Sequence, residues 1–298
     1  MLLQGVDTPT SPRTGPLIGR LEGPAPVLLI GNSVTQAGLD PRTLGATAGS
    51  VSGASPAHWI AVLQRARDLD RVVLYVSPQS MDDVVLDDPD DQEALLQLLS
   101  SADPELTGRA LPDDNAALQL ALRNRVSLRR QVVEGIANTP AEAILGLHKE
   151  GPIVGPATER LFAEEIGPNE APRLLEDPVG REPAPEPWPT RASLDESLMP
   201  LLVQRSLDAN ARLVVVLPAG RGDFHCEDEL APTRAWWSEQ PVDLVDFSTE
   251  TLPADSLSRD WHATRQGRTL ITERLARVLD TLPPVESDAP GRQWGSCF

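Results

Sequence analysis

The chain contains the stretch Val27-Leu28-Leu29-Ile30-Gly31-Asn32-Ser33, in which four apolar residues end at a glycine and a serine follows shortly after. A short continuous apolar run that stops at a turn residue is typical of a buried strand. In a parallel sheet such a strand is covered by helices on both faces. We therefore expect a central strand over 27–30, with Ser33 just beyond its carboxyl end.

Other segments repeat this pattern of a buried strand followed by a helix. The run Val72-Val73-Leu74-Tyr75-Val76 is β-branched and aromatic and is bounded by polar and proline residues. Alternation of strands and helices predicts a parallel sheet with helices on both faces, which is the three-layer α/β/α, flavodoxin-like fold class. Further strands are expected at 44–48, 213–217 and 242–247, and helices from Pro56 and over 194–209, 230–237 and 264–282.

The chain divides into one folded domain and less regular flanks. We expect an α/β domain over residues 27–282, an irregular proline-rich lead-in at 1–26 and an irregular tail at 283–298. A mainly helical insertion with a proline-rich return is expected at about 90–192. Within it, apolar spacing predicts helices over 91–99 and 113–137, and proline and acidic residues are dense over 166–192.

The composition excludes several classes of function. The 298 residues carry a formal net charge of −18 with Lys149 as the only lysine, which opposes binding to nucleic acid. There is no apolar run long enough for membrane insertion, and the first residues lack the basic start and apolar core of a signal peptide. We therefore expect a cytoplasmic protein. Cys226 and Cys297 lie far apart in the sequence and imply no disulfide framework.

Two distant segments supply the residue types of an acyl-transfer site. Ser33 follows the first strand, and Asp260-Trp261-His262 lies near the C-terminus just before a helical pattern. A serine hydroxyl needs an imidazole to accept its proton, and a carboxylate to orient that imidazole. Loops after parallel strands gather at one edge of the sheet, so the two segments are able to meet there.

These segments resemble the sequence blocks of the SGNH, or GDSL-like, hydrolase superfamily. Gly31-Asn32-Ser33 is similar to the Gly-Asp-Ser block after the first strand, and Val51-Ser52-Gly53 resembles the second block. The segment Asp260 to Gly267 resembles the last block, in which Asp and His precede the final helix. The resemblance is to divergent members near bacterial polysaccharide O-acetylation proteins, and it covers about half of the chain.

The resemblance implies a serine-dependent ester hydrolase or O-acyltransferase that needs no cofactor and no metal. Ser33 would be the nucleophile, His262 the base and Asp260 the residue that orients His262. The backbone amides of Ser33 and Gly53, with the Gln79 side chain as a substitute donor, would form the oxyanion hole. The implied substrate is a small acyl ester or an acylated glycan, and the implied partners are proteins of a polysaccharide-modification system.

The chain departs from the family pattern at two positions. The family places Asp three residues before His, whereas residue 259 is Arg here. The third block normally supplies an Asn, whereas this chain has Ser77-Pro78-Gln79-Ser80. The alternative is therefore a catalytically degenerate SGNH-like binding or scaffold protein. A nucleotide-binding domain is a weaker alternative, because no glycine-rich phosphate loop follows the first strand.

Other groups of polar or aromatic residues have ordinary explanations. The segment 223–228 contains metal-binding residue types but has no second cluster to complete a site, so a solvated loop is favoured. The acidic residues between Asp82 and Asp91 lack the spacing of a calcium loop. His58 is expected to be a surface or packing residue. The pair Trp236-Trp237 could line an acyl or sugar pocket, with one of the two in the core.

Overall fold

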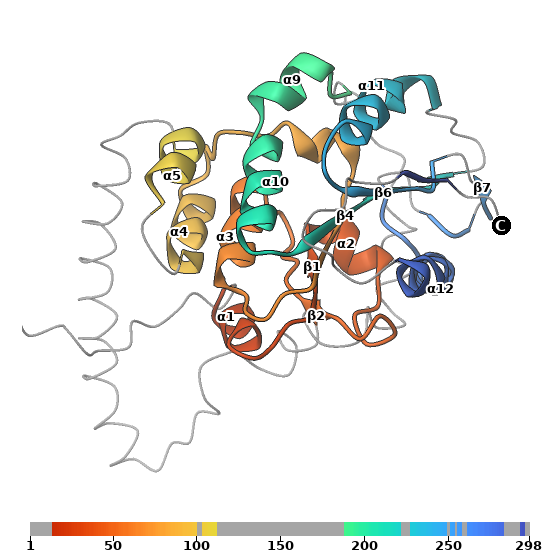
Figure 1. The fold of residues 1–298 in the computed structure, drawn as a ribbon, viewed down its shortest axis with the longest axis horizontal. Coiled ribbons are helices and arrows are strands. Elements are labelled where there is room, and N and C mark those ends of the chain that lie inside the picture. Colours follow the sequence, from red (N-terminus) through yellow and green to blue (C-terminus); the bar gives the residue numbers. More distant parts are fainter. Residues whose placement is uncertain are drawn as a thin grey trace, which may run out of the picture.

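A six-stranded parallel sheet forms the centre of the computed structural model (Figure 1). The structure describes residues 14–99, 103–111, 188–221, 227–248, 251–253, 255–257, 261–282 and 293–295. The strand order is β2-β1-β3-β4-β6-β8. The bounds are β1 Val27–Ile30, β2 Thr47–Ala48, β3 Arg71–Tyr75, β4 Arg212–Leu217, β6 Asp243–Asp246 and β8 Gln293–Gly295. A separate two-stranded parallel sheet pairs β5 (Gly220–Arg221) with β7 (Thr251–Leu252).

The strand order has the flavodoxin-like pattern. The first five strands of the main sheet, counted in chain order, lie in the order 2-1-3-4-5. The expected α/β class with a parallel sheet is therefore confirmed. β1 lies in the interior with β2 on one side and β3 on the other, in parallel register with both.

Helices cover both faces of the sheet and enclose two apolar clusters. Alternate residues of a strand point to opposite faces. Leu28 and Ile30 accordingly belong to one cluster, whereas Leu29 belongs to the other. One face is covered by α2 (Ser33–Gly38) and α12 (Arg265–Thr281). The other face is covered by α1 (Gly15–Leu21), α3 (Pro56–Arg65), α10 (Met199–Asp208) and α11 (Glu227–Ser238).

The first part of the expected insertion is built into the main core. α4 (Pro89–Leu98) confirms the helix expected at 91–99, and α5 (Pro104–Ala110) follows it. Leu95, Leu98 and Leu106 are buried in the same cluster as α3, beside which both helices lie in Figure 1. The helix expected at 113–137 and most of the proline-rich return lie outside the described residues.

The flanks contain regular structure that the sequence analysis did not anticipate. In place of a wholly irregular lead-in, α1 begins with Pro16 in its first turn and buries Leu17, Ile18 and Leu21. Pro is well suited to this position, because its missing N–H would have no partner there. In the tail, β8 pairs with β6 in parallel. The proline-rich and irregular composition hid both elements, because each is short.

The helix expected over 194–209 is two helices. α9 (Arg191–Glu196) ends before Ser197, and α10 starts at Met199. Pro200 lacks an N–H and its ring would clash with the carbonyl one turn earlier, so a continuous helix is excluded. The Ser197 hydroxyl accepts a hydrogen bond from the Met199 amide at 3.0 Å and so begins the second helix.

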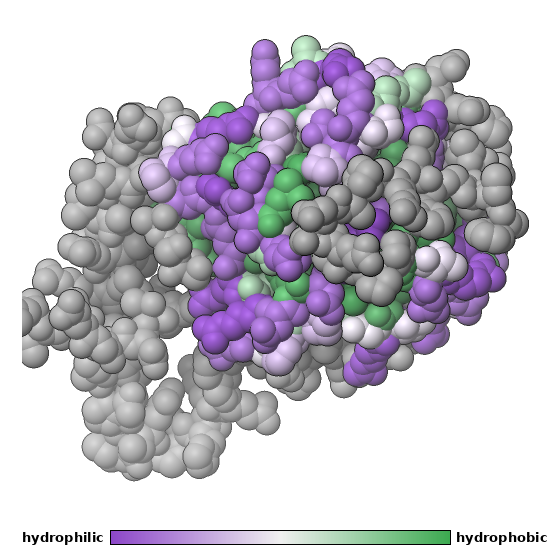
Figure 2. Space-filling view, viewed as in Figure 1, coloured by the Kyte–Doolittle hydropathy of each residue, from purple (hydrophilic) through white to green (hydrophobic). Residues whose placement is uncertain are grey.

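The described surface is largely hydrophilic in the view of Figure 2, where polar residues surround small apolar areas. Among the described residues, the large hydrophobic side chains that are exposed are Val85 and Leu207. Within the same part of the chain, no helix has the length and apolar character needed to cross a bilayer.

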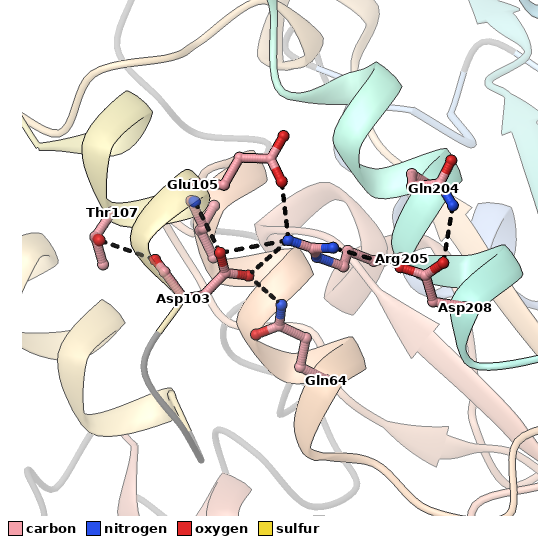
Figure 3. A network of polar contacts seen from close by, with 8 residues as sticks. Gln64, Asp103, Glu105, Thr107, Gln204, Arg205 and Asp208 are labelled. Carbon is pink, nitrogen blue, oxygen red and sulfur yellow. Dashed lines mark hydrogen bonds and ion pairs between the residues drawn. The ribbon is translucent and has the colours of Figure 1, made fainter.

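A polar clamp joins α3, α5 and α10 on one side of the domain (Figure 3). Asp103, which is nearly buried, caps α5 by accepting from the Leu106 amide at 3.0 Å, and Gln64 of α3 donates to the same carboxylate. Arg205 of α10 reaches Asp103 at 3.2 Å and Glu105 at 3.1 Å. Burial raises the pKa of Asp103, but these hydrogen bonds and the Arg205 charge outweigh burial and lower the pKa overall.

Tyr75 places an orphaned hydroxyl in the core at the end of β3. Its ring is fully buried in the cluster beneath α2, and Gly38 packs so closely that a Cβ there would meet the ring at 2.3 Å. The hydroxyl is buried and has no hydrogen-bond partner among the described residues. Burial therefore raises the pKa of Tyr75, because the charged form would be desolvated.

We predict that Asp103→Asn lowers the free energy of unfolding by about 1 kcal/mol near neutral pH, because Arg205 loses its charged partner. The pKa of Asp103 is lower in the folded than in the unfolded chain, so the carboxylate stabilises the fold fully above about pH 4. The gap between the two proteins should shrink as the pH falls below that value. Urea unfolding from pH 6 to pH 2.5 measures it. Glu105→Gln, on an exposed side chain, is the control with a smaller effect, and a gap that stays constant over this range would contradict the assignment.

We predict that Tyr75→Phe raises the free energy of unfolding by about 1 kcal/mol, since it removes a buried polar group with no partner and keeps the ring. Equilibrium urea unfolding of the variant and the parent measures the change. Tyr75→Leu, which also removes ring volume, should instead destabilise the protein. Destabilisation by Tyr75→Phe would mean that the hydroxyl is bonded.

Candidate active site

The candidate site lies at the carboxyl ends of β1 and β3, where the strand order reverses. After β1 the chain enters α2 on one face of the sheet, and after β3 it passes through the short 3-10 helix η1 (Pro78–Met81) towards α4 on the other face. The two loops therefore diverge from neighbouring strands. In open α/β sheets, ligands bind in the crevice at this switch point.

Gly31 makes the turn that brings Ser33 to this edge. Its φ is +143°, and a Cβ would lie 1.9 Å from the Thr35 hydroxyl, so no other residue fits without rearrangement. Thr35 in turn donates to the Tyr75 carbonyl at the end of β3. Ser33 is the first residue of α2 and is half-buried. Its backbone N–H belongs to the first turn, where an amide has no acceptor within its own helix.

Asn32 links the loop after β1 to the loop after β3. Its side-chain oxygen accepts from the Val34 amide at 3.0 Å and so caps α2. Its amide nitrogen donates to the Ser80 hydroxyl at 3.0 Å, and Ser80 is bonded to Ser77 at 2.8 Å. Asn32 therefore holds the start of α2, including Ser33, against the end of β3.

Gly53 lies in a neighbouring loop that is tied to the same turn. The Val51 amide donates to the Gly31 carbonyl at 3.2 Å, which keeps the loop after β2 beside the loop after β1. The Ala54 amide then donates to the Val51 carbonyl and closes a turn in which Gly53 has a φ of +69°. A glycine favours this conformation at the third position of a turn. Gly53 is exposed, so its backbone is accessible to a ligand.

Gln79 belongs to η1, next to Ser80. Its side-chain oxygen is shielded from solvent and has no hydrogen-bond partner among the described residues. Buried amide oxygens are normally bonded, so this atom is an acceptor with unused capacity at the edge of the site. The residue thus lies on the loop where the sequence analysis expected a substitute donor.

His262 is held in the segment that leads into α12. Leu257 and Ala263 form an isolated antiparallel bridge, and the Thr264 amide donates to the Ser256 carbonyl at 2.9 Å. Thr264 caps α12, and Gly267 in its first turn packs so tightly that a Cβ would lie 1.9 Å from the Ser256 oxygen. His262 is half-buried, and its Nδ1 atom is shielded from solvent.

Packing of α12 against α2 carries His262 towards the edge that holds Ser33 (Figure 1). Arg268 donates to the Leu39 carbonyl at 3.0 Å, and Thr272 accepts from the Asp40 amide at 3.0 Å. At the other end of α12, Arg71 at the amino end of β3 donates to the last-turn carbonyls. The N-terminus of α12 therefore points to the carboxyl edge of the sheet.

Burial strengthens this helix contact. Burial lowers the pKa of Arg268, and the nearby Asp40 carboxylate opposes this shift. A half-buried guanidinium that donates to a backbone carbonyl is costly to leave without its acceptor. The Arg268 contact thus favours one position of α12 relative to α2.

The expected residues are brought together to different degrees. Ser33, Gly53 and Gln79 lie on three loops at one edge that are joined by hydrogen bonds. No hydrogen bond joins Ser33 to His262 among the described residues, although such bonds often form only when substrate is bound. Asp260 lies outside the described residues.

Several polar groups near strand ends were missed by the sequence analysis. The Ser80 hydroxyl accepts a hydrogen bond from Asn32 and is also hydrogen-bonded to Ser77, and the position of both serines directly after a predicted strand was the available signal. Asp246 at the end of β6 pairs with Arg234 at 2.5 Å, a partner on another element that no local pattern indicates.

Three other predictions concern histidine, tryptophan and metal ligands. His58 is a buried packing residue whose Nδ1 bonds the Ser55 hydroxyl at 3.0 Å in a capping box. Trp236 and Trp237 are both fully buried, so neither lines an open pocket. Residues 222–226, which hold most of the possible metal ligands at 223–228, lie outside the described residues. Among the residues that the structure describes, no group of three or more metal-ligand side chains is found.

No protein-family model matches the chain, and searches of curated proteins and of solved structures give no match. The fold alone therefore defines the class of this protein, which is an α/β protein with a parallel sheet. Its candidate site lies at the switch point of that sheet.

We predict that Asn32→Ala lowers the free energy of unfolding by about 1 kcal/mol, because α2 loses its cap and Ser80 loses its donor. Asn32→Asp is the matched control, since Asp caps helices equally well and can accept from Ser80. Urea unfolding measures the change in stability of both variants, and hydrogen exchange at the Val34 amide measures the loss of the α2 cap. Unchanged exchange at Val34 in Asn32→Ala would show that Asn32 does not hold this turn.

Proposed function

We propose that this protein is an SGNH-like ester hydrolase or O-acyltransferase that works through an acyl-serine intermediate. The observation that supports this most directly is the position of Ser33. It opens α2 at the switch point, behind a glycine turn that leaves no room for a side chain, and beside the loop that contains Gly53. Helix starts of this kind stabilise negative charge.

In the proposed reaction, the Ser33 hydroxyl oxygen attacks the carbonyl carbon of the ester while His262 accepts the hydroxyl proton. The resulting tetrahedral intermediate collapses when the bond to the leaving oxygen breaks. His262 returns its proton to that oxygen, which departs as an alcohol. Asp260 is proposed to orient His262.

The second half of the reaction decides between hydrolysis and transfer. Water, activated by His262, would release the free acid, whereas a sugar hydroxyl would receive the acyl group. The substrate is proposed to be a small acyl ester or an acylated glycan, and protein partners of a polysaccharide-modification system would supply or receive it. The steps need no cofactor.

Charge on the carbonyl oxygen would be stabilised by the backbone amides of Ser33 and Gly53. The Val51 to Gly31 hydrogen bond supports this pairing because it keeps the two loops side by side. Loss of one such donor typically costs about 3 kcal/mol of transition-state stabilisation. The Gln79 side chain is a third candidate donor from the loop after β3.

A second candidate function is a binding or scaffold protein that keeps the fold without the chemistry. Two observations favour it: Ser33 and His262 make no hydrogen bond to each other among the described residues, and Asn is absent from the loop after β3. Activity measurements separate the two functions.

We predict that the protein hydrolyses short-chain aryl acetates and reacts with a fluorophosphonate probe. Ser33→Ala should abolish labelling and lower the hydrolysis rate at least about a thousandfold, because the nucleophile is lost. His262→Ala should lower the rate by about a hundredfold or more. Probe labelling and initial rates measure these effects, and mass spectrometry with added glycan acceptors detects transfer.

Ser238→Ala is the matched control for these measurements, because Ser238 is an exposed serine at the end of α11. It should leave labelling and hydrolysis unchanged. Equal labelling of the parent and Ser33→Ala would refute the nucleophile assignment. Absence of any hydrolysis or labelling by the parent would favour the binding function.

A further inference from the structure

Among the tryptophans whose burial the structure describes, two are not buried in the core. Trp59, Trp236 and Trp237 are each at most 1% exposed and pack inside the larger apolar cluster. In contrast, Trp188 and Trp261 are half-buried. A large aromatic ring that remains partly open to solvent offers contact area to a ligand.

Trp188 and Trp261 form an aromatic pair, and Trp261 is the residue before the proposed base His262. Their ring centroids are 6.0 Å apart and their planes are 88° to each other, which is the edge-to-face arrangement. Trp188 lies just before the cap of α9, whereas Trp261 immediately precedes His262. The pair therefore joins two distant parts of the chain beside the proposed base.

The backbone of Trp261 is held in a conformation that a bulky side chain rarely adopts. Its φ is +71°, in the left-handed region, where glycine and asparagine are the usual residues. An indole at this position is retained at an energetic cost. Backbone strain of this kind is concentrated at functional sites, so the observed outlier points to a role for the ring.

The chemistry of the proposed reaction indicates which part of a substrate the pair would meet. His262 must reach the Ser33 hydroxyl first and the leaving oxygen afterwards. Groups next to the base therefore lie on the side of the departing alcohol, whereas the acyl group lies towards the oxyanion donors. Trp261 immediately precedes His262 in the chain, and an indole pair beside the base would contact the alcohol side of the ester.

We infer that Trp188 and Trp261 form a subsite for the alcohol part of the ester and select alcohols that contain a ring. This inference rests on the proposed function. Two perpendicular indoles present a face and an edge at a corner. The negative face attracts C–H groups or the positive edge of an aromatic ring, and a ring covers more of such a corner than a short chain does.

Three acetates test this preference at nearly constant leaving-group chemistry: ethyl, cyclohexylmethyl and benzyl acetate. We expect kcat/KM of the parent to be about tenfold higher for the ring esters than for ethyl acetate. Trp188→Ala and Trp261→Gly should remove this advantage, so that within each variant kcat/KM becomes about equal for the three esters. Glycine suits the left-handed backbone, so Trp261→Gly deletes the ring without straining the loop.

A matched acyl series separates the alcohol side from the acyl side. Ethyl acetate, propionate and butyrate vary only the acyl group, and their relative rates should be the same in the parent and both tryptophan variants. Val85→Ala, at an exposed apolar residue before α4, is the control for general loss of apolar surface. Comparing kcat/KM for an acetylated methyl glucoside with kcat/KM for benzyl acetate shows whether the sugar ring or the aryl ring is preferred.

The outcomes distinguish this inference from the proposed function. If Ser33→Ala abolishes hydrolysis but the tryptophan variants slow all esters equally, or change only the acyl series, the subsite is refuted and the nucleophile stands. Binding of benzyl alcohol or methyl glucoside to Ser33→Ala, followed by saturation-transfer NMR, tests the subsite without catalysis. Loss of this alcohol binding when Trp188→Ala is added to Ser33→Ala supports the subsite even if no ester is hydrolysed. Binding that persists in the Ser33→Ala, Trp188→Ala double variant overturns the subsite.

Discussion

Pairing of β1 with parallel strands on both sides is the constraint on which the rest of the structure depends. β2 and β3 occupy its two edges, and Leu28 and Leu29 point into different apolar clusters. A shift by one residue would exchange these faces, so the register is strongly specified. The point where β1 ends is therefore well defined, and the Gly31 turn starts α2 from it. The position of Ser33 follows directly from this pairing.

The second requirement is that the end of the chain returns to this edge. α12 packs on α2 through the Arg268 and Thr272 contacts, while Arg71 holds its far end at the base of β3. The entropic cost of closing so long a loop grows only slowly with its length, so the intervening segment does not prevent the return. The Asp103 clamp serves a different purpose, because it secures α5 to α3 and α10 on the opposite face.

Much of the fold could be predicted because its central strands are continuous apolar runs. β1, β3 and β4 are recognisable in this way, as are the capped starts of α3 and α12. α1 and β8 could not be predicted, since each is short and lies in a segment of irregular composition. At the candidate site, Ser33, Gly53 and Gln79 were predicted from their positions after strands and from the resemblance to the SGNH blocks, and their roles stay predictions. The Asn32, Ser80 and Ser77 link was not found, because it joins residues from two loops.

The sequence by itself determined the class of the fold, the strand ends and the chemical types placed after them, because these depend on local apolar runs and turn residues. Only the tertiary structure decided which loops are joined, that α12 lies beside α2, and that Trp188 meets Trp261. These contacts link residues far apart in the chain. Their geometry depends on how helices pack on the sheet, which no local pattern encodes.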